Sequence, residues 1–271
     1  TQEKKIMFGF VVALILALAG YAAMARAHVD KVWSIVYTVI LFLIVQLLVG
    51  LVIRSLMKRK QNDIQAVMTA AQEKINRQVM LFQRRPPSSM REAQEQLAKM
   101  QNDAVRKVLT ILDECKTLTY WNWMLARQLN TMRVQLYFQL KDFKKVDALL
   151  PKSLVIDQQT MAIKLVRLYR NGDPSLDRFY EKKCAKTKSD ALAFLASVYA
   201  WIKLKENDTV KATQALVAAR KKTDNAVLLE NCDRLVNGKF RQFSNAQFGD
   251  MWYALMLEEP KVKVQRQPRM Y

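Results

Sequence analysis

Two long uncharged stretches near the start of this 271-residue chain limit its fold more than any other feature. Residues 6–25 and 32–53 contain no Asp, Glu, Lys or Arg and are strongly apolar. Each stretch is close to the roughly 20 residues that an α-helix needs to cross the hydrocarbon core of a bilayer. Only residues 26–31 separate them, which is enough for a turn. The sequence therefore predicts a transmembrane helical hairpin within residues 1–60, with spans at about 6–25 and 32–53.

The first stretch also has features of a secretory signal peptide. Lys4 and Lys5 precede it, and small residues flank Arg26 at its end. The apolar run of a signal peptide, however, usually has only about 7–15 residues. The run in this chain is longer, and a second apolar stretch follows it closely. We therefore expect a retained membrane anchor rather than a cleaved signal.

Positive charges at the end of the second stretch predict the orientation of the hairpin. Arg54, Lys58, Arg59 and Lys60 follow it directly. Such clusters remain on the cytoplasmic side of a membrane. We therefore expect both termini and the large domain to face the cytoplasm from an inner (cytoplasmic) membrane, with the loop 26–31 outside.

Small residues recur every fourth position in the first span, at Gly9, Ala13 and Ala17. This spacing gives a smooth helix face that allows close contact with another helix. The partner is either the second span of the same hairpin or another subunit. Gln46 lies alone among apolar neighbours, so we expect it to find a hydrogen-bond partner in the packed interface.

The formal net charge of the chain is +20. Residues 54–271 hold 40 of its 44 basic and 22 of its 24 acidic residues, so +18 of this charge lies after the spans. Beside anionic lipid, each Lys or Arg that reaches the surface contributes about 1 kcal/mol. The lipid bilayer, an acidic protein partner and nucleic acid would each explain the excess, and its sign does not separate them.

Residues 61–118 are predicted to form a helical stalk that breaks at Pro86 and Pro87. Ser89 and Glu92 then form a capping-box pattern that starts a helix reaching to about Leu118. This helix carries apolar residues at nearly heptad spacing. They either pack on the stalk or the following domain, or form an oligomer seam: Leu97, Ala104, Val108, Ile111 and Leu118.

Residues 119–257 show a repeated pattern. Polar or helix-breaking interruptions at 141–142, 171–173, 206–208 and 237–239 separate apolar helical segments, with a period of about 33 residues. Paired helices at such a period are the signature of an α-solenoid. Since no alternating strand pattern occurs, the whole chain is expected to be all-α.

The chain resembles the tetratricopeptide superfamily over roughly residues 120–257. In the third repeat, whose two helices lie on either side of the interruption at 206–208, Leu195, Ala196 and Tyr199 match the small and aromatic positions of the first helix. The 4,3 spacing of its second helix is matched by Ala212, Leu216 and Ala219. In the first repeat, around the interruption at 141–142, Lys141, Asp142 and Phe143 stand at the position of the family's turn, although Pro151 shortens the second helix.

The resemblance implies a concave groove, lined by the first helices of the repeats, that binds extended peptides or partner helices. The residues that would face it are Gln128, Thr131, Gln135, Phe138, Asp190, Ser197 and Trp201. Trp201 is either an exposed binding hot spot or a core residue packed on the next repeat. Of Trp121 and Trp123, one is expected to meet the preceding helix or the membrane surface.

Few residues in the sequence suggest a catalytic, cofactor or metal site. The only histidine, His28, lies in the short loop, and the sequence has no phosphate loop, HExxH motif or nucleophile elbow. Cys115, Cys184 and Cys232 are widely spaced, so buried reduced thiols are expected. We therefore expect no catalytic, cofactor or metal site. Residues 258–271 are predicted to form a basic disordered tail.

These features together predict a membrane-anchored scaffold or adaptor that recruits or assembles a protein partner, as a subunit of a larger inner-membrane complex. The first alternative is a homo-oligomeric ring or pore base built from the hairpin and stalk. The second alternative is a membrane tether that binds nucleic acid through the basic domain.

Overall fold

The computed structural model describes residues 8–27, 30–85, 87 and 89–260. These residues form helices and no strand, which confirms the all-α prediction. The chain divides into two compact units, Thr1–Leu154 (unit 1) and Val155–Tyr271 (unit 2), so the predicted repeat region is split between them. His28, the Lys4 and Lys5 pair, and residues 261–271 of the basic tail lie outside the described residues.

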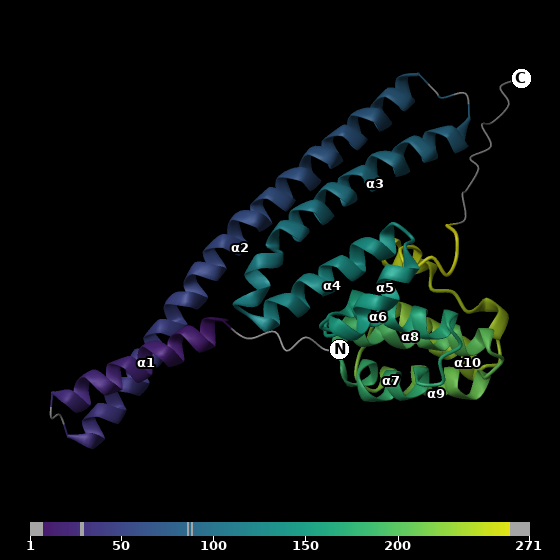
Figure 1. Cartoon of the computed structure of the whole chain (residues 1–271). Helices are drawn as coiled ribbons and strands as arrows, with labels where there is room; N and C mark the ends of the chain where they lie inside the picture. Colours follow the sequence, from purple (N-terminus) through teal and green to yellow (C-terminus); the bar gives the residue numbers. More distant parts are fainter. Residues whose placement is uncertain (1–7, 28–29, 86, 88, 261–271) are drawn as a thin grey trace, which may run out of the picture. The chain divides into compact units, whose positions relative to one another are not determined.

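Unit 1 contains the two apolar stretches, the stalk and the first pair of the later helices (Figure 1). Its elements are α1 (Phe8–Arg26), α2 (Lys31–Arg84), α3 (Met90–Glu114), the 3₁₀ helix η1 (Cys115–Tyr120), α4 (Trp123–Gln139), α5 (Phe143–Leu149) and the 3₁₀ helix η2 (Leu150–Lys152). Helices α1 and α2 are each long and apolar enough to cross a membrane.

The longest helix, α2, continues from the second apolar stretch into the polar stalk without interruption. Its 54 residues extend over about 80 Å at 1.5 Å per residue. The Asp30 carboxylate caps its start by accepting a hydrogen bond from the Val32 N–H at 3.2 Å. The helix ends at Arg84, before the two prolines, which lack the N–H that a continuing helix needs. The first part of the stalk is therefore a direct continuation of the second apolar stretch.

Helix α3 runs back along the second part of α2 (Figure 1). The Ser89 hydroxyl caps α3 by accepting a hydrogen bond from the Glu92 N–H at 3.1 Å, as the capping-box pattern predicts. The predicted end near Leu118 is wrong, because the α-helix ends at Glu114 and the chain continues as η1 to Tyr120. The tighter winding of a 3₁₀ helix turns the chain toward α4.

The core of unit 1 lies where α2, α3, η1 and α4 meet. Its buried members come from the last three of these elements and are Val108, Leu112, Cys115, Leu125 and Leu129. Partly buried side chains of α2 pack against them, namely Ile53, Met57, Ile64 and Val67. The part of α2 that follows the apolar stretch is therefore joined to α4 by apolar packing.

Unit 2 consists of shorter helices around a buried central one. Its elements are α6 (Gln158–Arg170), α7 (Leu176–Lys182), η3 (Cys184–Lys186), α8 (Ser189–Lys205), α9 (Thr209–Arg220), α10 (Ala226–Val236), η4 (Phe240–Gln242), η5 (Ala246–Phe248) and α11 (Asp250–Tyr253). Every residue of α8 from 192 to 203 is buried, and α8 contacts α6, α9 and α10. This helix is the core of unit 2.

The four predicted interruptions are helix ends with one geometry. Each contains a residue with a left-handed φ, which is 60° at Lys141, 62° at Gly172, 62° at Asn207 and 70° at Gly238. In every case the N–H of this residue bonds to the carbonyl three residues back, at 3.0 to 3.2 Å. The next N–H bonds to the carbonyl five residues back, at 2.8 or 2.9 Å. This pattern is the Schellman motif, which satisfies the last carbonyls of a helix.

The residue after the left-handed position influences whether a new α-helix begins at once. The carboxylates of Asp142 and Asp208 cap α5 and α9, each accepting a hydrogen bond from the N–H three residues later, at 3.3 and 3.0 Å. Asp173 accepts one from the N–H two residues later, at 2.8 Å, just before α7. At the fourth turn, Lys239 has no carboxylate to cap a helix, and only the 3₁₀ helix η4 comes next.

Candidate functional site

The contact between α1 and α2 is lined by the predicted small residues. Gly9, Ala13 and Ala17 are the buried residues of α1. A Cβ atom added at Gly9 would lie 3.2 Å from Cγ1 of Val49, so the two helices are in close contact there. In this structure the smooth face of α1 therefore packs on the second apolar stretch of the same chain.

Gln46 has the hydrogen-bond partner that its apolar surroundings led us to expect. Its side-chain amide donates to the Gly9 carbonyl across the α1–α2 contact, at 3.3 Å. In an environment without water, a side-chain amide that has no hydrogen-bond partner raises the free energy of the folded state by roughly several kcal/mol. The bond therefore favours the observed register of the two helices.

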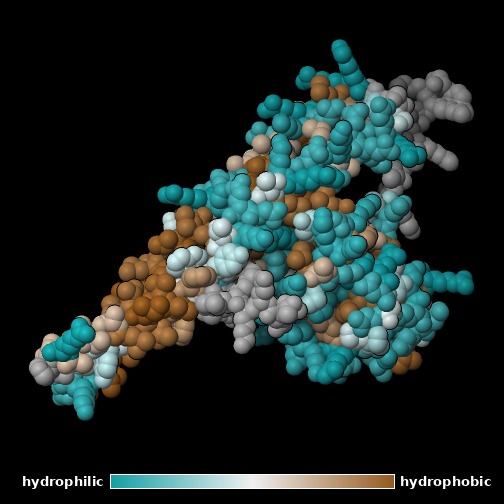
Figure 2. Space-filling model, in the orientation of Figure 1, coloured by the Kyte–Doolittle hydropathy of each residue, from teal (hydrophilic) through white to brown (hydrophobic). Residues whose placement is uncertain are grey.

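The opposite faces of these helices carry a wide apolar surface. Val32, Leu43 and Leu47 are 66%, 59% and 63% exposed, and many neighbouring large apolar side chains are about half exposed. Figure 2 shows hydrophobic residues covering this hairpin. Contiguous exposed apolar surfaces of this kind mark contact with a membrane or another protein.

Cations come directly after this apolar surface. The side chains of Arg54, Lys58 and Arg59 are exposed. Lys60 differs, because its ammonium group pairs with Glu114 of α3 at 2.6 Å. The hydrogen bond to Glu114 raises the pKa of Lys60. Three of the four predicted topology residues are therefore exposed, while Lys60 ties the stalk to α3.

An aromatic corner lies at the start of α1. It consists of Tyr120 and Trp121, which are 44% and 41% exposed at the junction of η1 and α4. The Trp121 ring lies 6.3 Å from the Phe8 ring, centroid to centroid. Its carbonyl oxygen is 3.3 Å from the position of a Cβ at Gly9. The sequence indicated that one tryptophan here meets a helix or the membrane, but not that α1 is the helix contacted.

The residues of the predicted oligomer seam pack against other helices of the same chain. Ala104 and Val108 are buried, and Leu97, Ile111 and Leu118 are half-buried. Val108 and Leu118 belong to the core in which α2 side chains take part. Of the two readings of this seam, the structure displays the one in which it packs on the stalk.

The predicted groove residues divide between the units. Gln128, Thr131, Gln135 and Phe138 belong to α4 in unit 1, and Asp190, Ser197 and Trp201 belong to α8 in unit 2. Phe138 and Ser197 are buried, at 2% and 0% exposed, so neither faces an open groove in this structure. The Thr131 hydroxyl accepts a hydrogen bond from the Leu154 N–H at 2.9 Å. Gln128 and Asp190 are exposed.

Of the two readings of Trp201, the structure displays the buried one, since Trp201 is only 7% exposed. Its ring makes edge-to-face contacts with Tyr169 and Trp252, at centroid distances of 6.1 and 5.7 Å. Its indole N–H donates to Glu258 at 2.7 Å, and the Trp252 N–H donates to the other oxygen of the same carboxylate at 3.0 Å. The C-terminal part of unit 2 therefore covers Trp201.

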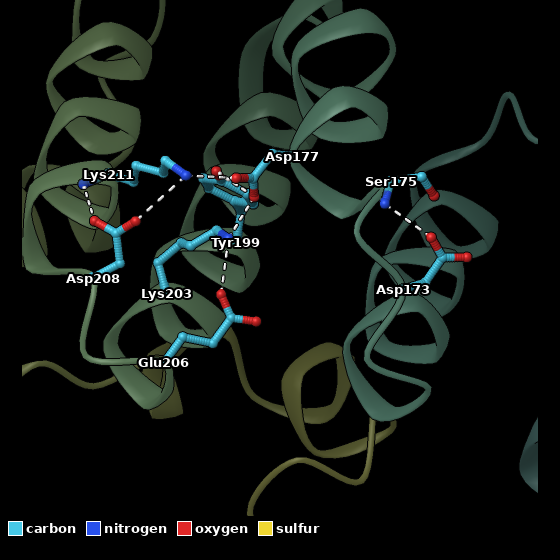
Figure 3. A network of polar contacts seen from close by, with 8 residues as sticks. All are labelled: Asp173, Ser175, Asp177, Tyr199, Lys203, Glu206, Asp208 and Lys211. Atoms are coloured by element: carbon cyan, nitrogen blue, oxygen red, sulfur yellow. Dashed lines mark hydrogen bonds and ion pairs between the residues drawn. The ribbon is translucent and has the colours of Figure 1, made fainter.

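A polar network joins α7, α8 and α9 (Figure 3). The Asp177 carboxylate accepts a hydrogen bond from the Tyr199 hydroxyl at 3.0 Å and pairs with Lys203 and, at 2.7 Å, with Lys211. Lys203 is buried and also pairs with Glu206 at 2.8 Å. The network therefore gives a buried cation two carboxylate partners, which compensates for its lost hydration.

The pKa shifts of Asp177, Lys203 and Tyr199 keep these three groups in their ordinary states at neutral pH. Burial raises the pKa of Asp177, but the hydrogen bonds from Lys203, Lys211 and Tyr199 outweigh it and lower that pKa overall. Burial lowers the pKa of Lys203, but its bonds to the two carboxylates leave it raised. Burial, followed by the Asp177 charge, raises the pKa of Tyr199. The network therefore stabilises the packing of α7, α8 and α9.

Groups capable of metal or thiol chemistry do not converge in the part of the chain that the structure describes. No three His, Cys, Asp or Glu side chains gather there to hold a metal ion. The three cysteines are buried and free, and burial raises the pKa of Cys184 to about 12. In comparisons with known proteins, no family model, curated protein or solved structure matches the chain.

Proposed function

We propose that the protein is a membrane-anchored scaffold. In this proposal the α1–α2 hairpin spans a bilayer, and the helices after it hold a protein partner at the cytoplasmic face. The single observation that carries the proposal is the wide apolar surface of a hairpin whose inner contact is already filled. Water would leave that surface unfavourably hydrated, whereas the hydrocarbon core of a bilayer accommodates it.

Two features support a defined depth and orientation of the α1–α2 hairpin in the bilayer. Tyr120 and Trp121 are exposed where α1 begins, and such amphipathic rings favour the membrane–water interface. Arg54, Lys58 and Arg59 come after the apolar part of α2 and are exposed. The aromatic rings favour a membrane–water interface at this level, and the cations favour the cytoplasmic side for it, with the remaining helices on the same side.

The recurring turns support a tetratricopeptide-like architecture for the later helices. Four Schellman motifs at a spacing of roughly one family repeat connect successive helices. Stacked helical hairpins give extended surfaces for protein partners. Anchoring such a surface to a membrane raises the effective concentration of the partner for other components there. No chemistry is required for this role.

The scaffold accounts for the structure better than a homo-oligomeric ring or pore base. That alternative was motivated by the small-residue face of α1 and by the seam of α3. Both surfaces are filled by α2 of the same chain. An oligomer would therefore need other contact surfaces.

The proposal is tested by photo-cross-linking in native membranes. A photoreactive amino acid replaces Gln128 in α4 or Asp190 in α8, two exposed groove candidates, or Gln214 in α9 as an exposed control. We expect an adduct with one discrete protein from position 128 or 190 and none from position 214. The adduct is identified by mass spectrometry.

Other products of this experiment would exclude the scaffold. A ladder at multiples of the 31.4 kDa chain mass would indicate the homo-oligomer. Adducts that contain nucleic acid and vanish at high salt would indicate the nucleic-acid tether. Identical adduct patterns at all three positions would mean that the proposed groove residues do not recognise a partner.

A further inference from the structure

A basic cavity lies in unit 1 among the end of α3, η1, α4, α5 and η2. Its volume is about 590 Å³. Four cations line it, Lys116, Arg133, Lys145 and Lys152, and they come from different elements of the chain. The lining contains one carboxylate, that of Asp113. The fold therefore concentrates an excess of positive charge around a space large enough for a small ligand.

Two of these cations are held in place by the fold. Arg133 is only 14% exposed, and its guanidinium donates to the Leu112 carbonyl at 2.8 Å and to Asp113 at 3.0 Å. The Lys145 ammonium pairs with Asp142 at 2.9 Å, and this bond raises the pKa of Lys145. Both groups are therefore oriented before any ligand arrives, which lowers the entropic cost of binding.

The other two cations remain available. Among the described residues, no carboxylate pairs with the ammonium groups of Lys116 and Lys152. The backbone at Lys152 is held by the fold, because the Asn130 side chain donates to its carbonyl at 3.1 Å. An anion that enters the cavity can therefore meet two charges that are not already neutralised.

The mixed lining indicates the chemical class of the ligand. A phosphate group offers one negative charge as a diester and up to two as a monoester, together with several acceptor oxygens, which match ammonium groups and the fork of an arginine. Ala126, Ala148 and Leu149 add apolar surface that could contact an organic group next to the phosphate. A phosphate monoester or diester suits this lining better than a bare inorganic anion.

The place of the cavity in the chain favours a lipid as the source of the phosphate. Lys116 and Thr119 belong to η1, which ends at the aromatic corner beside the start of α1. If the hairpin spans a bilayer, this corner lies at the level of the headgroups. The lipid assignment rests on the proposed function, whereas the affinity for a phosphate does not.

We propose that this cavity binds the phosphate of an organic ligand, supplied by the headgroup of an anionic phospholipid. Lys116 and Lys152 provide the uncompensated charge, and Arg133 and Lys145 orient the phosphate. Bound lipid would connect η1, α4 and α5 to the membrane surface beside the hairpin. The site thus gives the scaffold a preference for anionic membranes.

The first experiment uses the full-length protein in phosphatidylcholine nanodiscs that contain a minor fraction of phosphatidic acid. Native mass spectrometry then counts the phosphatidic acid that the protein retains. We expect the K116Q/K152Q variant to retain about tenfold less than the wild type, since it loses two charge-assisted bonds. The matched control K99Q/K144Q loses the same charge from exposed lysines outside the cavity. We expect it to remain within about twofold of the wild type.

The second experiment identifies the source of the phosphate. Glycerol 3-phosphate and inorganic phosphate are titrated into the detergent-solubilised protein and its two double variants. If neither binds while phosphatidic acid does, the lipid headgroup is the ligand. If glycerol 3-phosphate binds with the same dependence on Lys116 and Lys152, the phosphate site stands with a soluble ligand.

Two results would overturn the proposal. Equal losses in the cavity variant and the control would mean that only diffuse charge attracts the lipid. Absence of both lipid and monoester binding, in protein that enters nanodiscs normally, would refute the site and leave the membrane anchor intact. Failure of the wild type to enter nanodiscs would instead refute the anchor, and the titration would still test the cavity.

Discussion

One carboxylate connects two of the tryptophans that pack together in unit 2. Glu258 is the acceptor for two indole N–H groups, those of Trp201 and Trp252. The Lys205 ammonium lies 5.1 Å from the centre of the Trp201 ring. A buried indole that loses its acceptor keeps the cost of its desolvation. The stability of this packing therefore depends strongly on a single side chain near the end of the described chain.

Replacing Glu258 by Ala should destabilise the protein by about 1–3 kcal/mol, because it leaves two largely buried indole donors without their acceptor. The free energy of unfolding is measured by denaturant titration with tryptophan fluorescence. Glu259→Ala removes the same charge from the neighbouring exposed residue. We expect that control to change stability by no more than about 0.5 kcal/mol. Equal effects of the two substitutions would contradict the role of Glu258.

The Asp177 network predicts a dependence of stability on pH. The pKa of Asp177 is lower in the folded protein than its ordinary value of 3.8. Its contribution is therefore fully present above pH 3.8 and is lost as the pH falls through the folded pKa. Asp177→Asn should cost about 2 kcal/mol at pH 7, since it removes a partner of the buried Lys203.

The same substitution should matter less in acid. Denaturation measured from pH 7 downward should show the gap between wild type and Asp177→Asn closing below pH 3.8. Asp224→Asn, at an exposed position, is the control for the loss of one acidic group. A gap that stays constant to the lowest pH would argue against the ion pairs as its cause.

Helix ends are the local units of this fold, and four of them use one turn. Two of the four left-handed positions hold glycine, whereas Lys141 and Asn207 do not. A side chain with a Cβ atom is strained in this region by about 1–2 kcal/mol. Asparagine adopts this region more readily than lysine, so the hydrogen bonds of the Schellman motif must outweigh the strain chiefly at Lys141.

Lys141→Gly should stabilise the protein by about 0.5–1 kcal/mol, because relief of the strain exceeds the added entropy of the unfolded chain. Thermal unfolding monitored by circular dichroism measures the change. Lys144→Gly places glycine inside α5 and should cost about 1 kcal/mol. If both variants melt below the wild type by similar amounts, the left-handed position is not strained as argued.

The α1–α2 contact has no room for a side chain at Gly9. A Cβ there would meet Val49 and the Trp121 carbonyl at 3.2 and 3.3 Å. Gly9→Leu should therefore destabilise the hairpin by about 1–3 kcal/mol through overpacking. Ala19→Leu enlarges an exposed position of the same helix and should be nearly neutral. Unfolding in detergent micelles compares the two, and a neutral Gly9→Leu would mean that the helices do not pack as described.

For the molecule as a whole, the proposed function places residues 61–271 on the cytoplasmic side of a membrane, anchored by the exposed apolar hairpin. A protease added outside intact cells should leave residues 61–271 uncleaved, because the bilayer shields them. Replacing Arg54, Lys58 and Arg59 by Gln should give a mixture of orientations, since these cations favour the cytoplasmic side. Lys60 is left unchanged because it pairs with Glu114. Cleavage of the wild-type domain from outside would refute the proposed topology.

The order of helices results from interactions between residues close together in the chain. Helix α2 ends before Pro86, Ser89 caps α3, and the four interruptions fall at Schellman turns. The lengths of the apolar stretches likewise indicate two helices able to cross a bilayer. Local hydrogen bonding and apolar length are properties of the sequence, so these features could be predicted without coordinates.

Exposure and long-range contacts could not be derived in that way. The same helical pattern fits an open or a covered Trp201, and the difference is made by the rings of Tyr169 and Trp252 and by Glu258, 57 residues later. Lys116 and Lys152 meet around one cavity only because α4 and α5 turn the chain back. Trp121 reaches α1 for a similar reason. Periodicity states which side of a helix is apolar, but packing between distant segments determines what covers that side.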